Sequence, residues 1–420
     1  MDNFASEMEK QLPAELAGLL ALAGETARNQ GQELYLVGGA VRDLLLGTPN
    51  LDLDLVASAD AIALAGEMAR LKAGKLITHP RFHTATVRWG QWSVDLATAR
   101  SESYAHPGAL PTVRLDTMER DLYRRDFTIN AMAIDLTPGQ CGELLDPYGG
   151  RDDLSKGFIR ILHGQSFTDD ATRIWRALRY EQRLDFRLEP ATLCLLQRDI
   201  PRLDTISGDR LRYELECVLR EERPEKVLRR AAELGVLGGL HPSLSGDGWL
   251  EARFAGARRL YSPGPPPPGL YLALLAWPLS QRETEEFITR LRLPKALCQV
   301  MRDSLNLRAR TGLLASPGLS PGGVHSLLDG FSPAAITAAR LAADSPVAGQ
   351  HLRLFQDKWR YIKPALTGAD LINLGVAPGP RLKAILKRLQ QARLDGRVSN
   401  RREETALVKQ WLAGDKGQKS

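Results

Sequence analysis

The chain has 420 residues, of which 43% are hydrophobic and 25% are charged. A chain of this length and composition can bury real cores and is not disordered as a whole, so two to four domains are expected. Its net charge of +6 suits a polyanionic partner without requiring one.

No segment indicates export or membrane insertion. The first residues, MDNFASEMEKQ, are acidic and polar, unlike a signal peptide. The longest apolar stretches, such as LAGLLALAG and LYLALLAW, are far shorter than a membrane span. The four cysteines are scattered without a CxxC pair, which is typical of reduced thiols and disfavours a zinc site. We therefore expect a cytoplasmic protein with no membrane partner.

Helix and strand patterns alternate over about the first 150 residues. The predicted order is a helix at 13–30, a strand at 34–37, a helix at 41–46 ending at Gly47, a strand at LDLDLV, a helix at 61–72, a hairpin turning at Gly90-Gln91 and a buried strand in TINAMAIDL. Residues 100–121 are rich in Gly, Pro and charge and predict a mobile loop.

From about residue 168 the pattern becomes helical. A Pro/Gly cluster, YSPGPPPPGL, predicts a break near residue 265. The expected fold class is therefore α+β, with a mixed sheet first and helices afterwards.

The strand LDLDLV carries two carboxylates. On a strand, residues two apart share a face, so Asp52 and Asp54 project together while Leu51, Leu53 and Leu55 face the core. Neighbouring carboxylates repel each other, so this arrangement is stable only if the face is well solvated or a cation lies between them. The pattern alone also fits an ordinary half-exposed strand with an acidic face.

The glycines before this strand favour a phosphate site. Gly38 and Gly39 separate a strand from a helix, and bare backbone N–H groups at such a turn can cradle phosphate, with Arg42 within reach. A triphosphate there would lie beside Asp52 and Asp54, which suit Mg²⁺ and two-metal phosphoryl transfer. A dinucleotide site is excluded on pattern, because GGAVRD is not G-x-G-x-x-G and the acidic pair follows too soon.

Five motifs then occur in one order: LVGGAVRDLLLG, the D-x-D strand, RRDFTINAMAID, DPYGGRDDL and DDATRIWRALRY. In this the chain resembles class II tRNA nucleotidyltransferases, the CCA-adding enzymes and their poly(A) polymerase relatives, over residues 30–240 and again in LTGADLINLGVAPGPRLKAILKRLQQARLDG. The resemblance implies a polymerase-β-like nucleotidyltransferase head at 1–155, a helical neck with a nucleotide-reading motif at 156–222, a helical body at 223–330 and a tRNA-binding helical tail at 331–420.

The stretch DDATRIWRALRY allows two interpretations. Helical spacing places Asp170 one turn before Arg173, with Arg176 and Arg179 at steps of three, which also fits a solvated helix face with ion pairs. Cytosine and adenine each offer an amino donor beside a ring acceptor, so one Asp–Arg pair can read both, whereas uracil and guanine present the reverse polarity. In the family this is the role of the E/D-D-x-x-R motif, which maps onto Asp170 and Arg173; the first acidic residue here is Asp169 instead of the commoner Glu.

The resemblance implies site residues one by one. Asp52 and Asp54 would hold the metal and carry catalysis. Nucleotide binding is expected from eight further residues: Gly38, Gly39, Arg42, Arg125, Asp170, Arg173, Arg176 and Arg179. For Asp126 a helix-cap or salt-bridge role stays open. Asp95 is either a third carboxylate or an exposed strand residue.

The expected function is Mg²⁺-dependent addition of C and A from CTP and ATP to the 3′ end of tRNA, with the terminal ribose hydroxyl as nucleophile. The full-length segment 100–121 argues against a CC-only enzyme, because the family associates a comparable loop with the switch from C to A. An A-adding enzyme with a CC-adding partner and a poly(A) polymerase both remain open, as does a non-catalytic RNA-binding protein, against which the intact carboxylates argue. Oligomeric state is not predicted.

Overall fold

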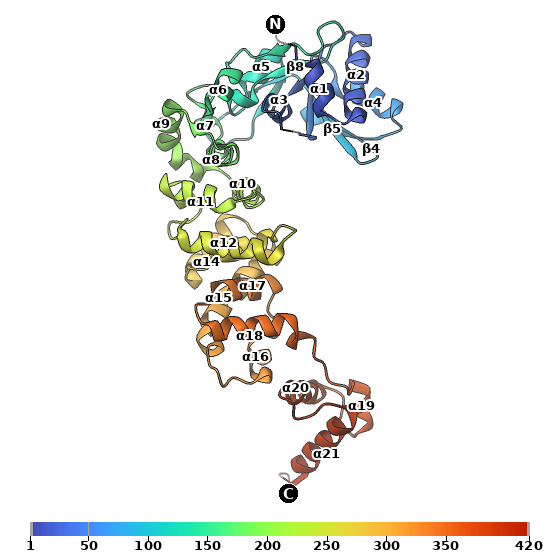
Figure 1. Cartoon of the computed structure of the whole chain (residues 1–420), viewed down its shortest axis with the longest axis vertical. Coiled ribbons are helices and arrows are strands. Elements are labelled where there is room, and N and C mark those ends of the chain that lie inside the picture. Colours follow the sequence, from blue (N-terminus) through green and yellow to red (C-terminus); the bar gives the residue numbers. More distant parts are fainter. Residues whose placement is uncertain (1–2, 49, 418–420) are drawn as a thin grey trace. The chain divides into compact units, whose positions relative to one another are not determined.

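The computed structural model describes residues 3–48 and 50–417. They form two compact units, one of Met1–Val218 with Glu233–Gly239 and one of Leu219–Ala232 with Leu240–Ser420. The first unit contains all the strands and the second is helical, so the expected α+β class with a mixed sheet followed by helices is confirmed (Figure 1). The expected division into four parts stays a prediction.

A seven-stranded mixed sheet organises the first unit. Its order is β3-β4-β5-β2-β1-β8-β9, with β2 parallel to β5 and antiparallel to β1. The strands are β1 (Leu34–Val37), β2 (Leu53–Ala57), β3 (Lys75–His79), β4 (Thr84–Trp89), β5 (Trp92–Thr98), β8 (Ala133–Asp135) and β9 (Leu144–Leu145). The predicted hairpin at Gly90 is confirmed as β4–β5, and Gly90 has the positive φ of 51° that a tight turn requires.

Short helices cover this sheet. They are α1 (Ala5–Gln11), α2 (Ala14–Asn29), α3 (Gly39–Leu45), α4 (Ala61–Leu71), α5 (Met118–Tyr123) and α6 (Gly150–Lys156). The amphipathic helix α4 buries Leu64 and Met68 and packs on β3, β4 and β5, and the Asp60 carboxylate caps its first turn by accepting from two backbone amides.

The strand prediction for LDLDLV needs one correction. Extended pairing begins at Leu53, and Leu53 and Leu55 are buried as expected. Leu51 is 44% exposed, so its assignment to the core is wrong. Residue 51 precedes the hydrogen-bonded ladder, and therefore nothing forces it to continue the alternation.

The segment 100–121 is also more regular than expected. It forms an antiparallel hairpin of β6 (Arg100–Ser103) and β7 (Thr112–Leu115) and then enters α5, so the predicted loop is wrong over the strands. Its glycine and prolines all lie between the two strands, at 107–111. The glycine and prolines therefore indicated only the turn at the tip of the hairpin.

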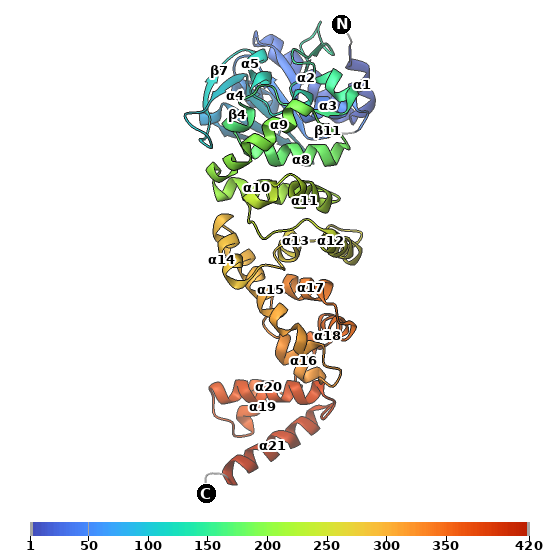
Figure 2. The same ribbon diagram turned by 90° about the vertical axis from the view of Figure 1, so that its left-hand side faces the viewer.

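Helices complete the first unit. These are α7 (Ser166–Asp169), α8 (Thr172–Leu184), α9 (Pro190–Asp199), the 3₁₀ turn η3 (Ile200–Thr205) and α10 (Gly208–Leu219). Figure 2 shows α8 lying along one side of the head. Ile174, Trp175 and Leu178 of α8 are buried, as their spacing predicts.

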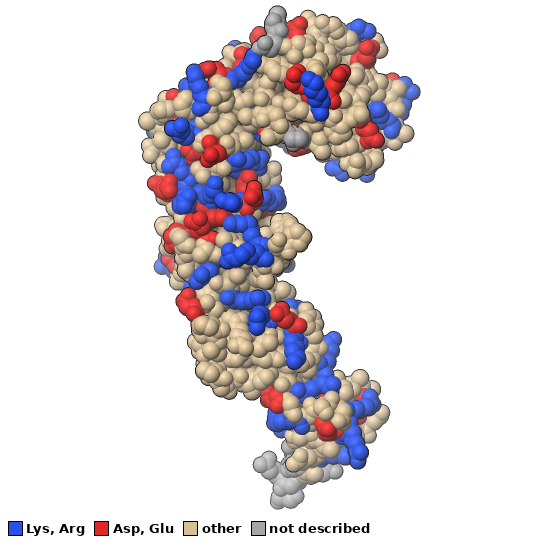
Figure 3. Space-filling view, viewed as in Figure 1, with Lys and Arg blue, Asp and Glu red and all other residues tan. Residues whose placement is uncertain are grey.

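The second unit is all helical. It contains α11 (Pro224–Glu233), α12 (Gly248–Tyr261), α13 (Pro268–Leu275), α14 (Gln281–Arg290), α15 (Lys295–Leu314), α16 (Pro321–Leu328), α17 (Pro333–Ala342), α18 (Pro346–Asp357), α19 (Gly368–Asn373), α20 (Pro380–Leu394) and α21 (Arg401–Gly417). The proline-rich break falls between α12 and α13, as predicted. Lys and Arg side chains are exposed over the visible face of α19–α21 (Figure 3). Among the residues that the structure describes, no helix is both long and apolar enough for a membrane crossing.

Candidate active site

The site begins where β1 ends. Gly38 follows the strand with φ 70° and ψ −130°, a conformation that strains any side chain, and α3 starts at Gly39. A Cβ at residue 38 would lie 3.0 Å from Nη1 of Arg125. Glycine therefore allows the strand-to-helix turn and also the close approach of this guanidinium.

The two predicted carboxylates lie beside this turn. Asp54 pairs in register with Val37 on one side and with Asp95 of the parallel strand β5 on the other. Asp52 immediately precedes the strand, and its backbone N–H donates to the Asn50 side chain at 2.9 Å. Both carboxylates line the same large cavity, as the alternation argument requires.

The surroundings of Asp54 disfavour its negative charge. Solvent in the cavity reaches the side chain, but the enclosing protein displaces much of the surrounding water and raises the pKa of Asp54 to about 6. Repulsion from Asp52 and Asp95 adds to this increase, and the Arg125 guanidinium opposes it. A bound divalent cation would remove that repulsion, so the donor set fits such an ion.

All ten predicted site residues line this one cavity, whose volume is about 860 Å³. They come from the β1–α3 turn, β2, the segment after α5, and α8 with the residues preceding it. Residues separated by more than a hundred positions therefore meet around one space, large enough for a nucleoside triphosphate.

The continuous helix that the spacing predicted for DDATRIWRALRY is interrupted at Asp170. α7 ends at Asp169, Asp170 is extended, and α8 begins at Thr172. One Asp170 oxygen accepts from the backbone N–H and the hydroxyl of Thr172, at 3.0 and 2.7 Å. This local hydrogen bonding competes with helix formation and explains the break.

Asp170 and Arg173 are not paired with each other. The second Asp170 oxygen accepts from Nη2 of Arg210 on α10 at 2.7 Å. Arg173 is buried and donates to the Ser166 hydroxyl and to the backbone carbonyl of Arg124, the latter at 2.7 Å. Sequence reasoning missed Arg210, because it lies forty positions from Asp170 and no local spacing connects them.

Asp126 anchors Arg176. Its Oδ2 accepts from Nε and Nη2 of Arg176 at 2.8 and 2.5 Å, and Oδ1 accepts from the Asn130 side chain. Burial alone would raise the pKa of Asp126, but the Arg176 charge and the hydrogen bonds lower it to about 2. The salt-bridge alternative for Asp126 is therefore confirmed.

Arg42, which the sequence places within reach of a phosphate, is already bonded to neighbouring side chains. It is 3% exposed, makes a bidentate pair with Asp43 at 2.8 Å and donates to Asn130 at 2.7 Å. Its guanidinium also lies 5.1 Å from the ring centre of Tyr180. It lines the cavity as a fixed charge in the wall.

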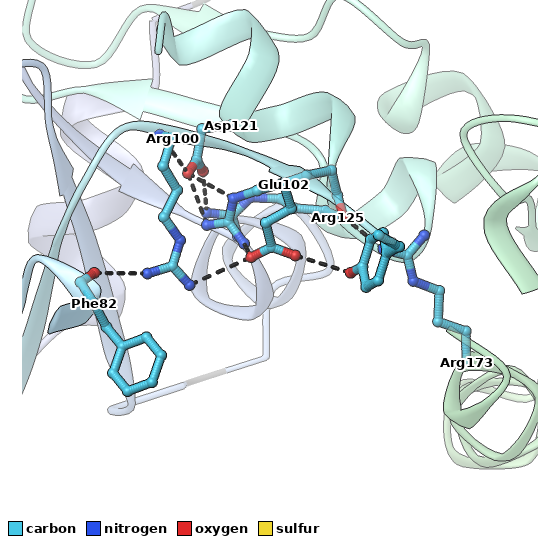
Figure 4. Close-up of polar contacts among 8 residues, drawn as sticks. Phe82, Arg100, Glu102, Asp121, Arg125 and Arg173 are labelled. Carbon is cyan, nitrogen blue, oxygen red and sulfur yellow. Dashed lines mark hydrogen bonds and ion pairs between the residues drawn. The ribbon is translucent and has the colours of Figure 1, made fainter. Parts of the chain in front are cut away.

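Figure 4 shows a network that links the hairpin to the site. Oε1 of Glu102 accepts from Arg124 at 3.0 Å, and Oε2 accepts from the Tyr104 hydroxyl at 3.0 Å. Asp121 accepts from both Arg124 and Arg125, which holds the predicted nucleotide contact Arg125 in place. The sequence indicated none of these partners of Arg125, since they depend on how the hairpin packs.

Among the described residues, no group of three or more His, Cys, Asp or Glu side chains could hold a metal ion.

Two family models match the chain. One, described as the poly A polymerase head domain, matches residues 34–160, and the other, described as the probable RNA and SrmB-binding site of polymerase A, matches residues 185–247.

Several known proteins are similar over nearly the whole chain. An A-adding tRNA nucleotidyltransferase of Halalkalibacterium halodurans is 32% identical over 98% of this chain and 96% of its own length. One of Geobacter sulfurreducens is 31% identical over 96% of this chain, which spans only 48% of that relative. The solved structure of the Thermotoga maritima CCA-adding enzyme complexed with tRNA_CCA superposes with a TM-score of 0.78 at 31% identity, over 98% of each chain. The likeness thus extends over both units, and the chain belongs to the family of tRNA nucleotidyltransferases and poly(A) polymerases.

Proposed function

We propose that this protein transfers nucleotides from CTP and ATP to the 3′ end of tRNA. The observation that carries the proposal is the cavity itself, where the D-x-D carboxylates, Arg125 and the reading motif lie together. The names and structures of the relatives, which act on tRNA, support the choice of acceptor. A cytoplasmic location, where tRNA is found, stays a prediction.

The triphosphate is placed against the β1–α3 turn. Backbone N–H groups at Gly38 and Gly39 and the guanidinium of Arg125 supply hydrogen bonds and positive charge. Arg125 and Arg176 are each held by a buried carboxylate, Asp121 and Asp126, so binding does not have to immobilise them.

The family implies a divalent metal ion, and we propose Mg²⁺ held by Asp52 and Asp54 with phosphate oxygens. Asp95 is beside Asp54 in strand register, but the described residues contain no group of three such side chains that could hold a metal ion, so the proposal rests on Asp52 and Asp54. When bound, Mg²⁺ increases the nucleophilicity of the ribose hydroxyl and stabilises the leaving pyrophosphate. The hydroxyl releases its proton to water as its oxygen forms a bond to the α-phosphorus, and the bond from that phosphorus to the bridging oxygen breaks, which releases pyrophosphate.

Base selection is assigned to Asp170 and Arg173. The Asp170 carboxylate would accept from the amino group of cytosine or adenine, and Arg173 would donate to the neighbouring ring nitrogen. Arg210 and Thr172 already orient Asp170, and Ser166 orients Arg173. Both residues must shift hydrogen bonds toward the base, because Asp170 is bonded to Thr172 and Arg210, and Arg173 to Ser166, in the free protein.

Asp170→Asn is expected to weaken base discrimination. An amide can donate as well as accept, so uracil and guanine no longer leave a buried group without a partner. The ratio of kcat/KM for ATP over UTP should fall by about 10- to 100-fold, an effect of roughly 1–3 kcal/mol. Single-nucleotide incorporation with each of the four NTPs measures it, with Asp152→Asn as an exposed control. An unchanged ratio would contradict the assignment.

The activity is tested with two acceptors. Transfer RNA ending at the discriminator base should receive C from CTP, and tRNA ending in CC should receive one A from ATP. Products are resolved to single nucleotides on denaturing gels. An A-only enzyme is the second candidate, favoured by the A-adding relatives that match nearly the full chain, and it would extend only the second acceptor. Long A tracts on unrelated RNA would indicate a poly(A) polymerase, and no incorporation with RNA binding retained would indicate a non-catalytic binder.

A further inference from the structure

The sheet holds only one of the two carboxylates that are proposed to bind the metal. Asp54 lies within β2, which pairs with β1 on one side and with β5 on the other. Asp52 is exposed, precedes the first residue of that strand and lies outside both pairings. A metal ligand in a loop owes its position to its neighbours, so Asp52 needs support from outside the sheet.

The side chain of Asn50 provides this support. Its Oδ1 accepts from the backbone N–H of Asp52 at 2.9 Å, and its Nδ2 donates to Oδ2 of Asp43 on α3 at 2.7 Å. The two ends of an amide have opposite polarity, and here each end meets a group that it can bond. One half-buried side chain therefore connects the loop before β2 with the helix α3.

The attachment point on α3 is itself fixed. Oδ1 and Oδ2 of Asp43 each accept from Arg42 at 2.8 Å, and the buried Arg42 also donates to Asn130 at 2.7 Å. A bidentate ion pair that is largely removed from water keeps its geometry better than an exposed pair. Nδ2 of Asn50 is also close to the phosphate turn, 3.7 Å from where a Cβ on Gly39 would lie.

We propose that Asn50 is a positioning residue, which holds Asp52 beside Asp54 by tying the loop to the Arg42–Asp43 pair. The inference rests on the function proposed above, in which the two carboxylates hold a divalent ion. Asn50 acts through Asp52 and requires no contact with the reacting atoms. A ligand that has to be ordered when the ion binds costs conformational entropy, so loss of Asn50 should weaken ion binding and leave RNA binding unchanged.

The residue type matters because few side chains can make both bonds. Asn50→Asp would keep the acceptor for the Asp52 N–H but would place a second negative charge against Asp43. Asn50→Ser would keep a weaker acceptor for the backbone N–H two residues further on, but a serine hydroxyl is too short to reach Asp43 as well. Asn50→Ala makes neither bond.

Asn50→Ala in the full-length, metal-free protein is the first test. Mn²⁺, which takes the same oxygen ligands as Mg²⁺, is titrated and followed by the EPR signal of the free ion, with Asp52→Asn defining the binding at other sites. The dissociation constant should rise about tenfold, because removing a group that orients a metal ligand typically costs about 10- to 100-fold in affinity. Thr48→Ala is the matched control, since it removes a hydrogen bond to the Asp43 carbonyl from the same loop and leaves the bonds of Asn50 in place.

Kinetics separate this role from a general loss of structure. With ATP and a minihelix ending in CC, the Mg²⁺ concentration for half-maximal incorporation should rise about tenfold in Asn50→Ala. The KM for the RNA and the kcat at saturating Mg²⁺ should stay within about twofold of wild type. Asn50→Ser should fall between Asn50→Ala and wild type, and it provides the same comparison if Asn50→Ala does not fold.

Mn²⁺ affinity and Mg²⁺ requirement within about twofold of wild type in both Asn50 variants would overturn the inference. A lower kcat at saturating Mg²⁺ with an unchanged metal requirement would overturn it as well, because Asn50 would then act on another step. If the wild type binds Mn²⁺ through Asp52 but transfers no nucleotide to any RNA, the proposed function fails instead, and the Mn²⁺ titration still decides the role of Asn50.

Discussion

Asp54→Asn is expected to reduce nucleotide incorporation by at least about a thousandfold while tRNA binding persists. The amide keeps the shape of the side chain but loses the charge that we propose to bind the metal, and metal catalysis of phosphoryl transfer contributes several kcal/mol. Single-turnover incorporation with ATP and an RNA ending in CC measures the loss. Filter binding of the same RNA checks that the acceptor still binds.

The Asp54→Asn substitution should also change how the stability of the protein depends on pH. The folded-state pKa of Asp54 is raised to about 6, above its ordinary value, so the native protein binds this proton more tightly than the unfolded chain. Asp54 therefore costs stability as pH rises from about 4 through 6. Because cavity water screens the group, we expect Asp54→Asn to be more stable than wild type at pH 8 by up to about 1 kcal/mol, and equal to it near pH 4.

Thermal unfolding of the metal-free protein at both pH values tests this difference. Glu67→Gln serves as the control, since Glu67 lies on the outer side of α4 and forms an ion pair with the exposed Arg70. Appreciable incorporation by Asp54→Asn would refute the catalytic assignment, and lower stability at pH 8 than wild type would refute the electrostatic one.

Asp126→Asn is expected to destabilise the first unit by about 3 kcal/mol. The Asp126 side chain is 7% exposed and Arg176 is 32% exposed, so the substitution leaves a mostly desolvated guanidinium without its counter-charge. Breaking such a pair on one side typically costs about 3–5 kcal/mol, and the opening of Arg176 to the cavity places this pair at the lower end. Urea unfolding is followed by fluorescence after Trp249, Trp277, Trp359 and Trp411 of the second unit are replaced by Phe in all compared variants. The signal then comes from the first unit, which contains Trp89, Trp92 and the buried Trp175.

A surface pair provides the comparison. Asp152 and Lys156 form an exposed ion pair on α6, and Asp152→Asn should change stability by less than about 0.5 kcal/mol. Adding Arg176→Gln to Asp126→Asn should recover part of the loss, because no isolated charge then remains. If Asp126→Asn unfolds at the wild-type urea concentration, the pair is not a structural anchor, and the fixed position of Arg176 in the cavity wall needs another explanation.

The environment of Asp170 and Arg173 was only partly predictable from the sequence. The spacing of Asp170 and Arg173 predicted that both belong to one site, and both line the large cavity, but the helix predicted to carry them is interrupted at Asp170, which accepts from Thr172. The partner that orients Asp170 is Arg210, on another helix. Local spacing can place two residues on one surface, yet it contains no information about a third residue forty positions away.

Local pattern alone determined the strand with its acidic face, the glycine turn and the helical second unit, because each depends on interactions a few residues apart along the chain. Tertiary structure alone decided that Arg42 is buried against Asp43 and Asn130 and that the hairpin network holds Arg125. These features arise from long-range packing, where burial forces each polar group to find a partner, and the identity of that partner follows from the fold and not from its distance in sequence.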